Sequence, residues 1–141
     1  MGFKVTIEGA EKIELGIESV RKVVLKTDTP EDSNARSKDV GSTMVISGKI
    51  LTALDGEEFD GTRQMGVWSL IPAEKADCYR KVTVEVLSAD QIIRKIFFPN
   101  AFVVDYKEHY GDTEGVGTFE LVVKQKKDKL DQVKIEGGYS A

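Results

Sequence analysis

Apolar and polar side chains alternate along much of the chain, which is the pattern of half-buried β-strands. Residues 82–86 read Val-Thr-Val-Glu-Val and form the clearest predicted strand. The same period of two recurs at 102–107 and 119–124, and the apolar run at 92–98 predicts another strand. A last strand at 132–136 precedes a Gly-Gly-Tyr-Ser-Ala tail that we expect to be flexible.

The N-terminal half continues the pattern, with predicted strands at 3–8, 13–15, 20–26 and 43–54. In the last of these, the alternation places Gly48 on the face that should be buried. A glycine inside a strand often marks a bulge or a sharp bend, so we expect one near this position, where the strand turns a barrel corner.

Short connections separate the strands of the C-terminal half. Turn residues occupy 88–90, 99–100 and 111–115. Connections this short favour antiparallel hairpins, because a parallel pair needs a crossover of a dozen or more residues. The expected fold is all-β, a β-barrel of about eight antiparallel strands that forms a single domain over residues 1–141.

One stretch, residues 62–76, breaks the two-residue rhythm. Met65 and Trp68 fall on one helical face there, with Thr62 available as an N-cap and Pro72 as a stop. We therefore predict one short α-helix near 62–76. An alternative helix begins at the proline and runs on to the end of the stretch.

The segment 28–41 contains almost nothing to bury. A polar connection of this length is uncommon in a compact β domain, and such loops often carry function. We expect its polar side chains to form hydrogen bonds or ion pairs with a second subunit. The candidate residues are Asp32, Ser33, Asn34, Arg36, Ser37 and Lys38. The alternative is a surface loop without a partner.

Composition narrows the classes of function. The chain has 141 residues, of which 40% are hydrophobic and 31% charged, and a formal charge of −4. That charge disfavours binding to nucleic acid, because contact with a phosphate backbone needs clustered cations. The basic cluster at 124–129 is interpreted as solvated; alternatively, it makes a salt-sensitive contact with the acidic block at 57–60.

Metal, membrane and disulfide chemistry are not expected. Cys78 is the single cysteine and His109 the single histidine, so neither an intramolecular disulfide nor a usual zinc site can form. The N-terminus lacks the apolar segment of a signal peptide, and no run approaches the roughly 20 apolar residues of a membrane helix. Synthesis in a cytoplasm, without membrane insertion, is the expectation.

Catalysis is not expected either. His109 lies near Glu108 and Asp112 in the sequence, but no nucleophile, metal-binding or phosphate-binding motif accompanies them. The glycine-rich stretch 111–117 carries two acids and no lysine, so it would repel phosphate, and we interpret it as a hairpin turn. We predict no enzyme activity and no cofactor.

A small barrel that binds an apolar ligand is the alternative function. Its cavity would be lined by aromatic side chains, namely Trp68, Phe97, Phe98, Phe102 and Phe119. Aromatic residues at strand and helix spacing more often fill a core.

Three segments carry a resemblance to a known family. These are 96–106 (Ile-Phe-Phe-Pro-Asn-Ala-Phe-Val-Val-Asp-Tyr), 117–125 (Gly-Thr-Phe-Glu-Leu-Val-Val-Lys-Gln) and 133–138 (Val-Lys-Ile-Glu-Gly-Gly). These segments come after a predicted helical segment, and their order along the chain resembles that of the haemolysin-coregulated protein (Hcp) and phage tail-tube family. The polar segment 28–41 also falls where such proteins carry an extended loop that reaches a neighbouring subunit.

The resemblance implies a structural role. It implies a subunit of a phage tail, a phage-like particle or a type VI-like contractile injection system, assembled into stacked hexameric rings around a channel for DNA or a protein effector. The implied partners are other copies of the chain, sheath, baseplate or spike proteins, and a translocated cargo. The implied location is the bacterial cytoplasm or a phage-infected host, followed by assembly into a particle or export with the tube.

Overall fold

The computed structural model describes residues 1–28, 41–50, 61–72, 74–112, 117–126, 130 and 132–140. The strands are β1 (Gly2–Glu8), β2 (Lys12–Leu15), β3 (Val20–Asp28), β4 (Gly41–Lys49), β5 (Arg80–Ser88), β6 (Gln91–His109), β7 (Thr118–Gln125), β8 (Lys134–Glu136) and β9 (Tyr139–Ser140). One α-helix, α1 (Gly61–Ser69), and a 3-10 turn, η1 (Ala76–Cys78), precede β5. The predicted all-β fold with one short helix is confirmed.

Every ladder between the described strands is antiparallel, and the strands follow the order β2-β1-β5-β6-β7-β4-β3. Strands β8 and β9 pair with β6 outside this path. The ends of the path, β2 and β3, do not pair with each other among the described residues, although β1 and β3 are in contact. The expected barrel is therefore a sheet that folds over itself without closing its ladder.

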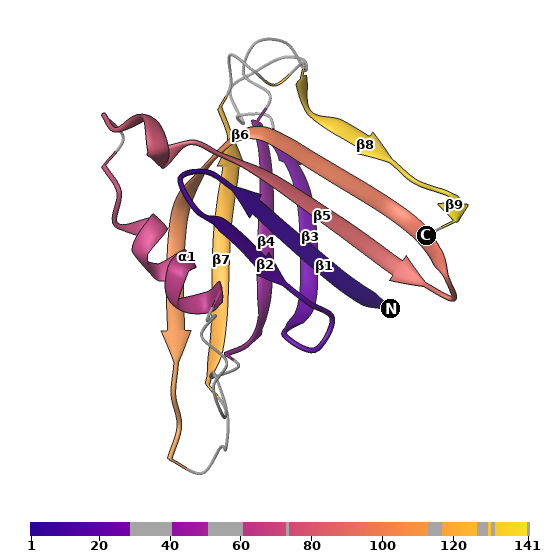
Figure 1. Cartoon of the computed structure of the whole chain (residues 1–141), viewed down its shortest axis with the longest axis horizontal. Helices are drawn as coiled ribbons and strands as arrows, with labels where there is room; N and C mark the ends of the chain where they lie inside the picture. Colours follow the sequence, from indigo (N-terminus) through magenta and orange to yellow (C-terminus); the bar gives the residue numbers. More distant parts are fainter. Residues whose placement is uncertain are drawn as a thin grey trace.

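The sheet forms two crossing layers (Figure 1). We call β2, β1, β5 and residues 91–100 of β6, with β8 and β9, the β1 layer. Residues 101–109 of β6, with β7, β4 and β3, form the β3 layer. Strand β6 is 19 residues long and belongs to both layers, because β5 pairs with its first half and β7 with its second half.

The continuity of β6 corrects the sequence analysis, which placed two strands on either side of a turn at Pro99 and Asn100. Proline has no N–H to donate, but the ladder to β5 shifts register at this point, between the partners Phe98 and Ala101. The Asn100 N–H is bonded to the Gln125 side chain of β7 (3.1 Å). The backbone therefore bends from one layer into the other without ending the strand.

The expected irregularity near Gly48 is present. The ladder between β3 and β4 shifts register between Val20 and Lys22, opposite Gly48. The Ser19 carbonyl oxygen approaches so closely that a Cβ atom on Gly48 would overlap it. Strand β4 ends at Lys49, and positions 51–54 of the predicted strand lie outside the described residues.

The C-terminal tail corrects a second prediction. Tyr139 and Ser140, expected to be flexible, form β9 and pair with the start of β6. Gly138 makes this possible, because its φ of +81° is a backbone conformation that other residues rarely adopt. Its N–H donates to the carbonyl of Ile92 (2.9 Å).

The helix α1 fills the core between β2 and the second half of β6. Met65 and Trp68 are buried, as the predicted helical face requires. The helix begins at Gly61, so Thr62 lies inside it and is not its N-cap. Of the alternative helix beginning at Pro72, the described residues contain only η1.

Candidate functional site

Two long strand edges in the β3 layer have no pairing strand among the described residues. One is the outer edge of β3, which is nine residues long. The other is the edge of β6 over residues 102–109, on the side away from β7. The helix α1 contacts this part of β6 through side chains, for example where the Tyr106 hydroxyl donates to the carbonyl of Thr62 (3.1 Å). Unpaired backbone groups make such edges templates for pairing with another chain.

The β1 layer has much shorter free edges. Strand β2 has four residues, β8 three and β9 two. Short edge strands are one of the means by which proteins avoid unwanted pairing. The capacity for edge-to-edge pairing is therefore concentrated in the β3 layer.

The outer face of the β3 layer, which we call the basic face, carries the side chains that alternate with the core-facing ones. Among the side chains of this face that the structure describes, the charged members of the alternating set are five lysines and two carboxylates, a formal charge of +3 (five minus two). These residues are Lys22, Lys26, Lys49, Lys107, Lys124, Asp105 and Glu120. Across its middle, Val24, Val45 and Val122 are register partners on three neighbouring strands and form an apolar band.

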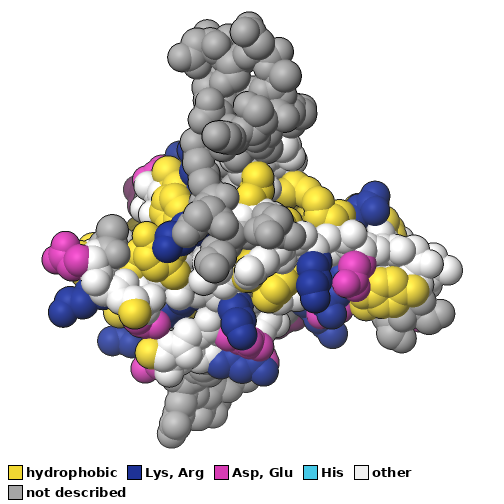
Figure 2. Space-filling view, turned by 90° about the horizontal axis from the view of Figure 1, so that it is seen from above, with side chains coloured by type: hydrophobic (Ala, Val, Ile, Leu, Met, Phe, Trp, Pro, Cys, Tyr) yellow, Lys and Arg dark blue, Asp and Glu magenta, His cyan; other side chains and the backbone are white. Residues whose placement is uncertain are grey.

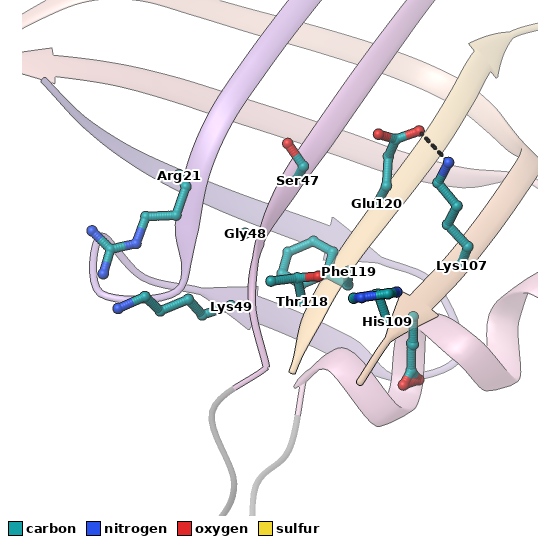
Figure 3. A pocket seen from close by; sticks show the side chains of 10 residues that line it. Arg21, Ser47, Gly48, Lys49, Lys107, His109, Thr118, Phe119 and Glu120 are labelled. Carbon is teal, nitrogen blue, oxygen red and sulfur yellow. Dashed lines mark ion pairs between the residues drawn. The ribbon is translucent and has the colours of Figure 1, made fainter. Parts of the chain in front are cut away.

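A hollow of about 740 Å³ opens on this face near the ends of the strands (Figure 3). Arg21 and Lys49 extend from β3 and β4 on one side of it. On the other side, the ammonium group of Lys107 lies 3.7 Å from the carboxylate of Glu120. The carboxylate of Glu120 offsets the charge of Lys107 on that side, so the side formed by Arg21 and Lys49 is the more positive side of the hollow.

The outer face of the β1 layer, which we call the chequered face, differs in its charge pattern. Register partners there have opposite charges, as Glu8 and Lys81 do, and Glu85 lies between Lys4 and Lys95. Pairs of opposite charge across neighbouring strands stabilise a sheet and leave little net charge. Figure 2 looks at the molecule from above, and on the described surface seen there basic, acidic and hydrophobic side chains are also interspersed.

A buried arginine joins α1 to the β1 layer. The Arg80 side chain is 6% exposed, its Nη2 atom lies 2.7 Å from Oδ2 of Asp77, and its guanidinium stacks 5.3 Å from the centroid of the Trp68 ring. The same carboxylate accepts a hydrogen bond from the Ala10 N–H (3.0 Å). The hydrogen bond from Arg80 holds the pKa of Asp77 below its ordinary value. The indole N–H of Trp68 donates to the carbonyl of Cys78 (2.9 Å). We interpret this cluster as structural, because its polar and charged groups bond to one another or to the backbone, or stack on the Trp68 ring.

The residues considered for catalysis do not converge. His109 and Glu108 are consecutive on β6, so they point to opposite faces of the strand, and Glu108 accepts a hydrogen bond from Tyr110. Burial raises the pKa of the Cys78 thiol, which makes it a poorer nucleophile at neutral pH. In the described part of the chain no three His, Cys, Asp or Glu side chains are grouped to hold a metal ion.

The aromatic residues proposed for a ligand cavity are mostly core. Trp68, Phe98 and Phe119 are buried and pack with aliphatic side chains of both layers. Phe102 contacts the ring of Tyr79, with centroids 6.0 Å apart. Their positions therefore match a packed interior better than the lining of a binding site.

The predicted subunit-contact residues, Asp32, Ser33, Asn34, Arg36, Ser37 and Lys38, all lie outside the described residues. So do the acidic block at 57–60 and residues 127–129 of the basic cluster at 124–129. No α-helix in the described ranges has the length and hydrophobicity to cross a membrane.

Sequence reasoning missed the two long edges and the basic face. Lysines did recur at polar strand positions, but the sequence does not say which strands are neighbours. Only the register shows that lysines 22, 107 and 124 share one face, and that β3 and β6 border the same layer.

Comparison with known proteins identifies the fold. No family model matches the sequence, and no curated protein matches it either. Solved structures do match. A chain of the anti-feeding prophage baseplate matches with a TM-score of 0.57 and 11% identity, over 96% of this chain and 93% of that chain. Hcp1 from Flavobacterium johnsoniae matches with a TM-score of 0.52 and 16% identity, over 97% of this chain and 96% of that chain. A chain of the PVC sheath-tube complex, an extracellular contractile injection system, also matches, with a TM-score of 0.56 and 13% identity, over 97% of this chain and 89% of that chain. The chain therefore has the fold of Hcp and tail-tube proteins, and these structural neighbours are Hcp1 and chains of injection-system particles.

Proposed function

We propose that this protein is a structural, non-catalytic subunit of a tube. Copies join side by side into a ring, and rings stack around a channel. The observation that carries this proposal is that two long strand edges, which no described strand pairs, belong to one layer and lie on opposite sides of it.

Edges on opposite sides of one layer allow a head-to-tail contact. The outer edge of β3 in one copy pairs with residues 102–109 of β6 in the next copy. A contact between two different surfaces repeats from copy to copy, and it produces a ring when the rotation closes. The backbone N–H and C=O groups of both long edges then have hydrogen-bond partners, so neither edge is left exposed to pair with an unrelated chain.

The number of strands in the β3 layer fits this arrangement. The layer runs β6, β7, β4, β3, and each neighbouring pair is antiparallel. With four strands, the two border strands run in opposite directions. An added copy in the same orientation therefore continues the antiparallel alternation, and a layer with an odd number of strands would not.

The structural neighbours support the same conclusion. They are components of assembled baseplate, sheath-tube and injection-system particles, and they match nearly the whole length of this chain. By analogy with them we propose sixfold rings and contacts with sheath or baseplate proteins. The segment 28–41 would add contacts between subunits through the residues named above.

Two measurements test this proposal. Negative-stain electron microscopy of the concentrated protein should show rings or short tubes. Hydrogen–deuterium exchange should then compare dilute and assembled protein. Amides of residues 20–28 and 102–109 should become protected on assembly, because pairing occupies their free N–H groups.

Strand β2 supplies the internal control, since its short edge takes no part in the proposed contact and its exchange should stay unchanged. Protein that remains monomeric at high concentration would refute the tube. Rings that form without added protection at β3 and β6 would refute the edge contact.

A further inference from the structure

The proposed ring fixes which face of the β3 layer borders the channel. One face of this layer packs on α1 and the β1 layer, and the other is the basic face. Sheets stack about 10 Å apart, so the β1 layer adds considerable thickness to each copy. The room available to every copy shrinks toward the axis of a ring and grows away from it. The thicker side therefore lies outside, and the basic face lines the channel.

The charge on that face is opposite to the charge of the whole chain. The chain carries −4, whereas the described side chains of the basic face include five lysines and two carboxylates. Arg21 adds a further cation at the hollow. A ring repeats this face in every copy, so the excess positive charge surrounds the channel and attracts negative partners.

We propose that the basic face binds an acidic polypeptide carried inside the tube. This inference rests on the proposed function for its location. Lysine side chains supply long, adaptable cationic contacts to Asp and Glu. The band formed by Val24, Val45 and Val122 supplies apolar contact to the side chains between those acids.

Nucleic acid fits this face less well. Asp105 lies in the same row as the valine band, and Glu120 lies between Ser47 and Lys107. Carboxylates at these positions would repel phosphates, and a row of valines offers nothing to a phosphate backbone. Neutralisation of successive phosphates needs an uninterrupted basic surface.

A matched pair of triple variants tests the proposal. K22Q/K49Q/K124Q removes three lysines from the basic face, and K81Q/K95Q/K134Q removes three from the chequered face. The probe is a labelled unstructured peptide of Glu and Ser with interspersed Leu. A peptide with Lys in place of Glu and a single-stranded DNA oligonucleotide serve as comparisons. Fluorescence anisotropy gives Kd at low and moderate salt.

The acidic peptide should bind the unmodified protein, and added salt should weaken the binding. Its Kd should rise about tenfold in the basic-face variant and less than about twofold in the control variant. Equal binding of the Lys peptide, equal loss in both variants, or tighter binding of DNA would each overturn the proposal.

Electron microscopy of the same samples keeps this test separate from that of the tube. If the unmodified protein forms no rings, the tube and the channel location fall. Peptide binding to the monomer then still decides whether the basic face prefers an acidic polypeptide.

Discussion

The two layers share one core but differ in the surfaces that they turn away from it. The chequered face places opposite charges on neighbouring strands, and its layer ends in strands of two to four residues. The basic face has a charge excess and an apolar band, and its layer ends in long edges. The β1 layer is thus suited to meet solvent, and the β3 layer to meet other polypeptides.

The core-facing positions of the two layers do not show this difference. Both layers contribute Val, Ile and Phe at alternate positions, and both bury them fully. The two layers differ in the side chains at their outward-facing positions and in the lengths of their border strands. A substitution on the basic face can therefore change assembly or binding while leaving the fold intact, whereas a substitution in the shared core affects both layers.

The largest expected effect comes from breaking the shared core at Trp68. Its ring is 1% exposed and contacts Arg80, so Trp68→Ala should lower the free energy of unfolding by about 3–5 kcal/mol. Val67→Ala on the exposed side of the same helix should stay within about 0.5 kcal/mol. Urea denaturation measures both. A loss below about 1 kcal/mol for Trp68→Ala would show that the helix is not part of the core.

A smaller loss is expected where the backbone of the β3 layer is crowded. In Gly48→Ala the new methyl group overlaps the Ser19 carbonyl oxygen, which is bonded to the Lys49 N–H (2.8 Å). We expect a loss of about 2 kcal/mol or more. At Gly41 a Cβ meets no atom of the described residues within 4 Å, so Gly41→Ala is the control and should be nearly neutral. Similar losses in the two variants would mean that the close approach at Gly48 is unimportant.

Cysteine labelling tests which face is enclosed. Ser47 and Thr83 are half-buried and outward-facing in the β3 and β1 layers, respectively. In assembled protein, Ser47→Cys should react with a bulky maleimide about tenfold more slowly than Thr83→Cys, a difference of about 1.4 kcal/mol. In dissociated protein the two rates should be similar. Buried Cys78 gives a low background. Faster labelling at position 47 than at 83 in tubes would reverse the assignment of the channel face.

The smallest effect is a pH dependence at Asp77 of η1, which pairs with Arg80 of the β1 layer. Because the pKa of Asp77 is lowered, its carboxylate stabilises the fold above the unfolded value near 3.8, and this contribution is lost as pH falls through the lower folded value. Asp77→Asn should cost about 1 kcal/mol at pH 7, and the difference from the unmodified protein should shrink below pH 3.8. The exposed Glu14, paired with Lys12 at 3.0 Å, gives a control in Glu14→Gln, which should show no measurable change. A difference for Asp77→Asn that persists unchanged at low pH would mean that the charge is not responsible.

The sequence predicted the strands from local alternation, and the structure confirms β1, β2, β3, β5 and β7 within a few residues. It also predicted the burial of Met65 and Trp68 and the irregularity near Gly48. These features depend on neighbours along the chain or on the absence of a side chain. They can therefore be read from one segment at a time.

Features that depend on distant partners were decided by the tertiary structure. Pro99 and Asn100 carry a turn signal, yet β6 continues through them because Gln125 bonds the freed N–H and the ladder to β5 shifts there. The terminal residues form β9 because Ile92 accepts the Gly138 N–H. The basic face and the two long edges of the β3 layer arise from register, which joins residues as far apart in sequence as Thr43 and Lys124. Alternation fixes which side of a strand is buried, but only packing of the whole chain decides which strands become neighbours.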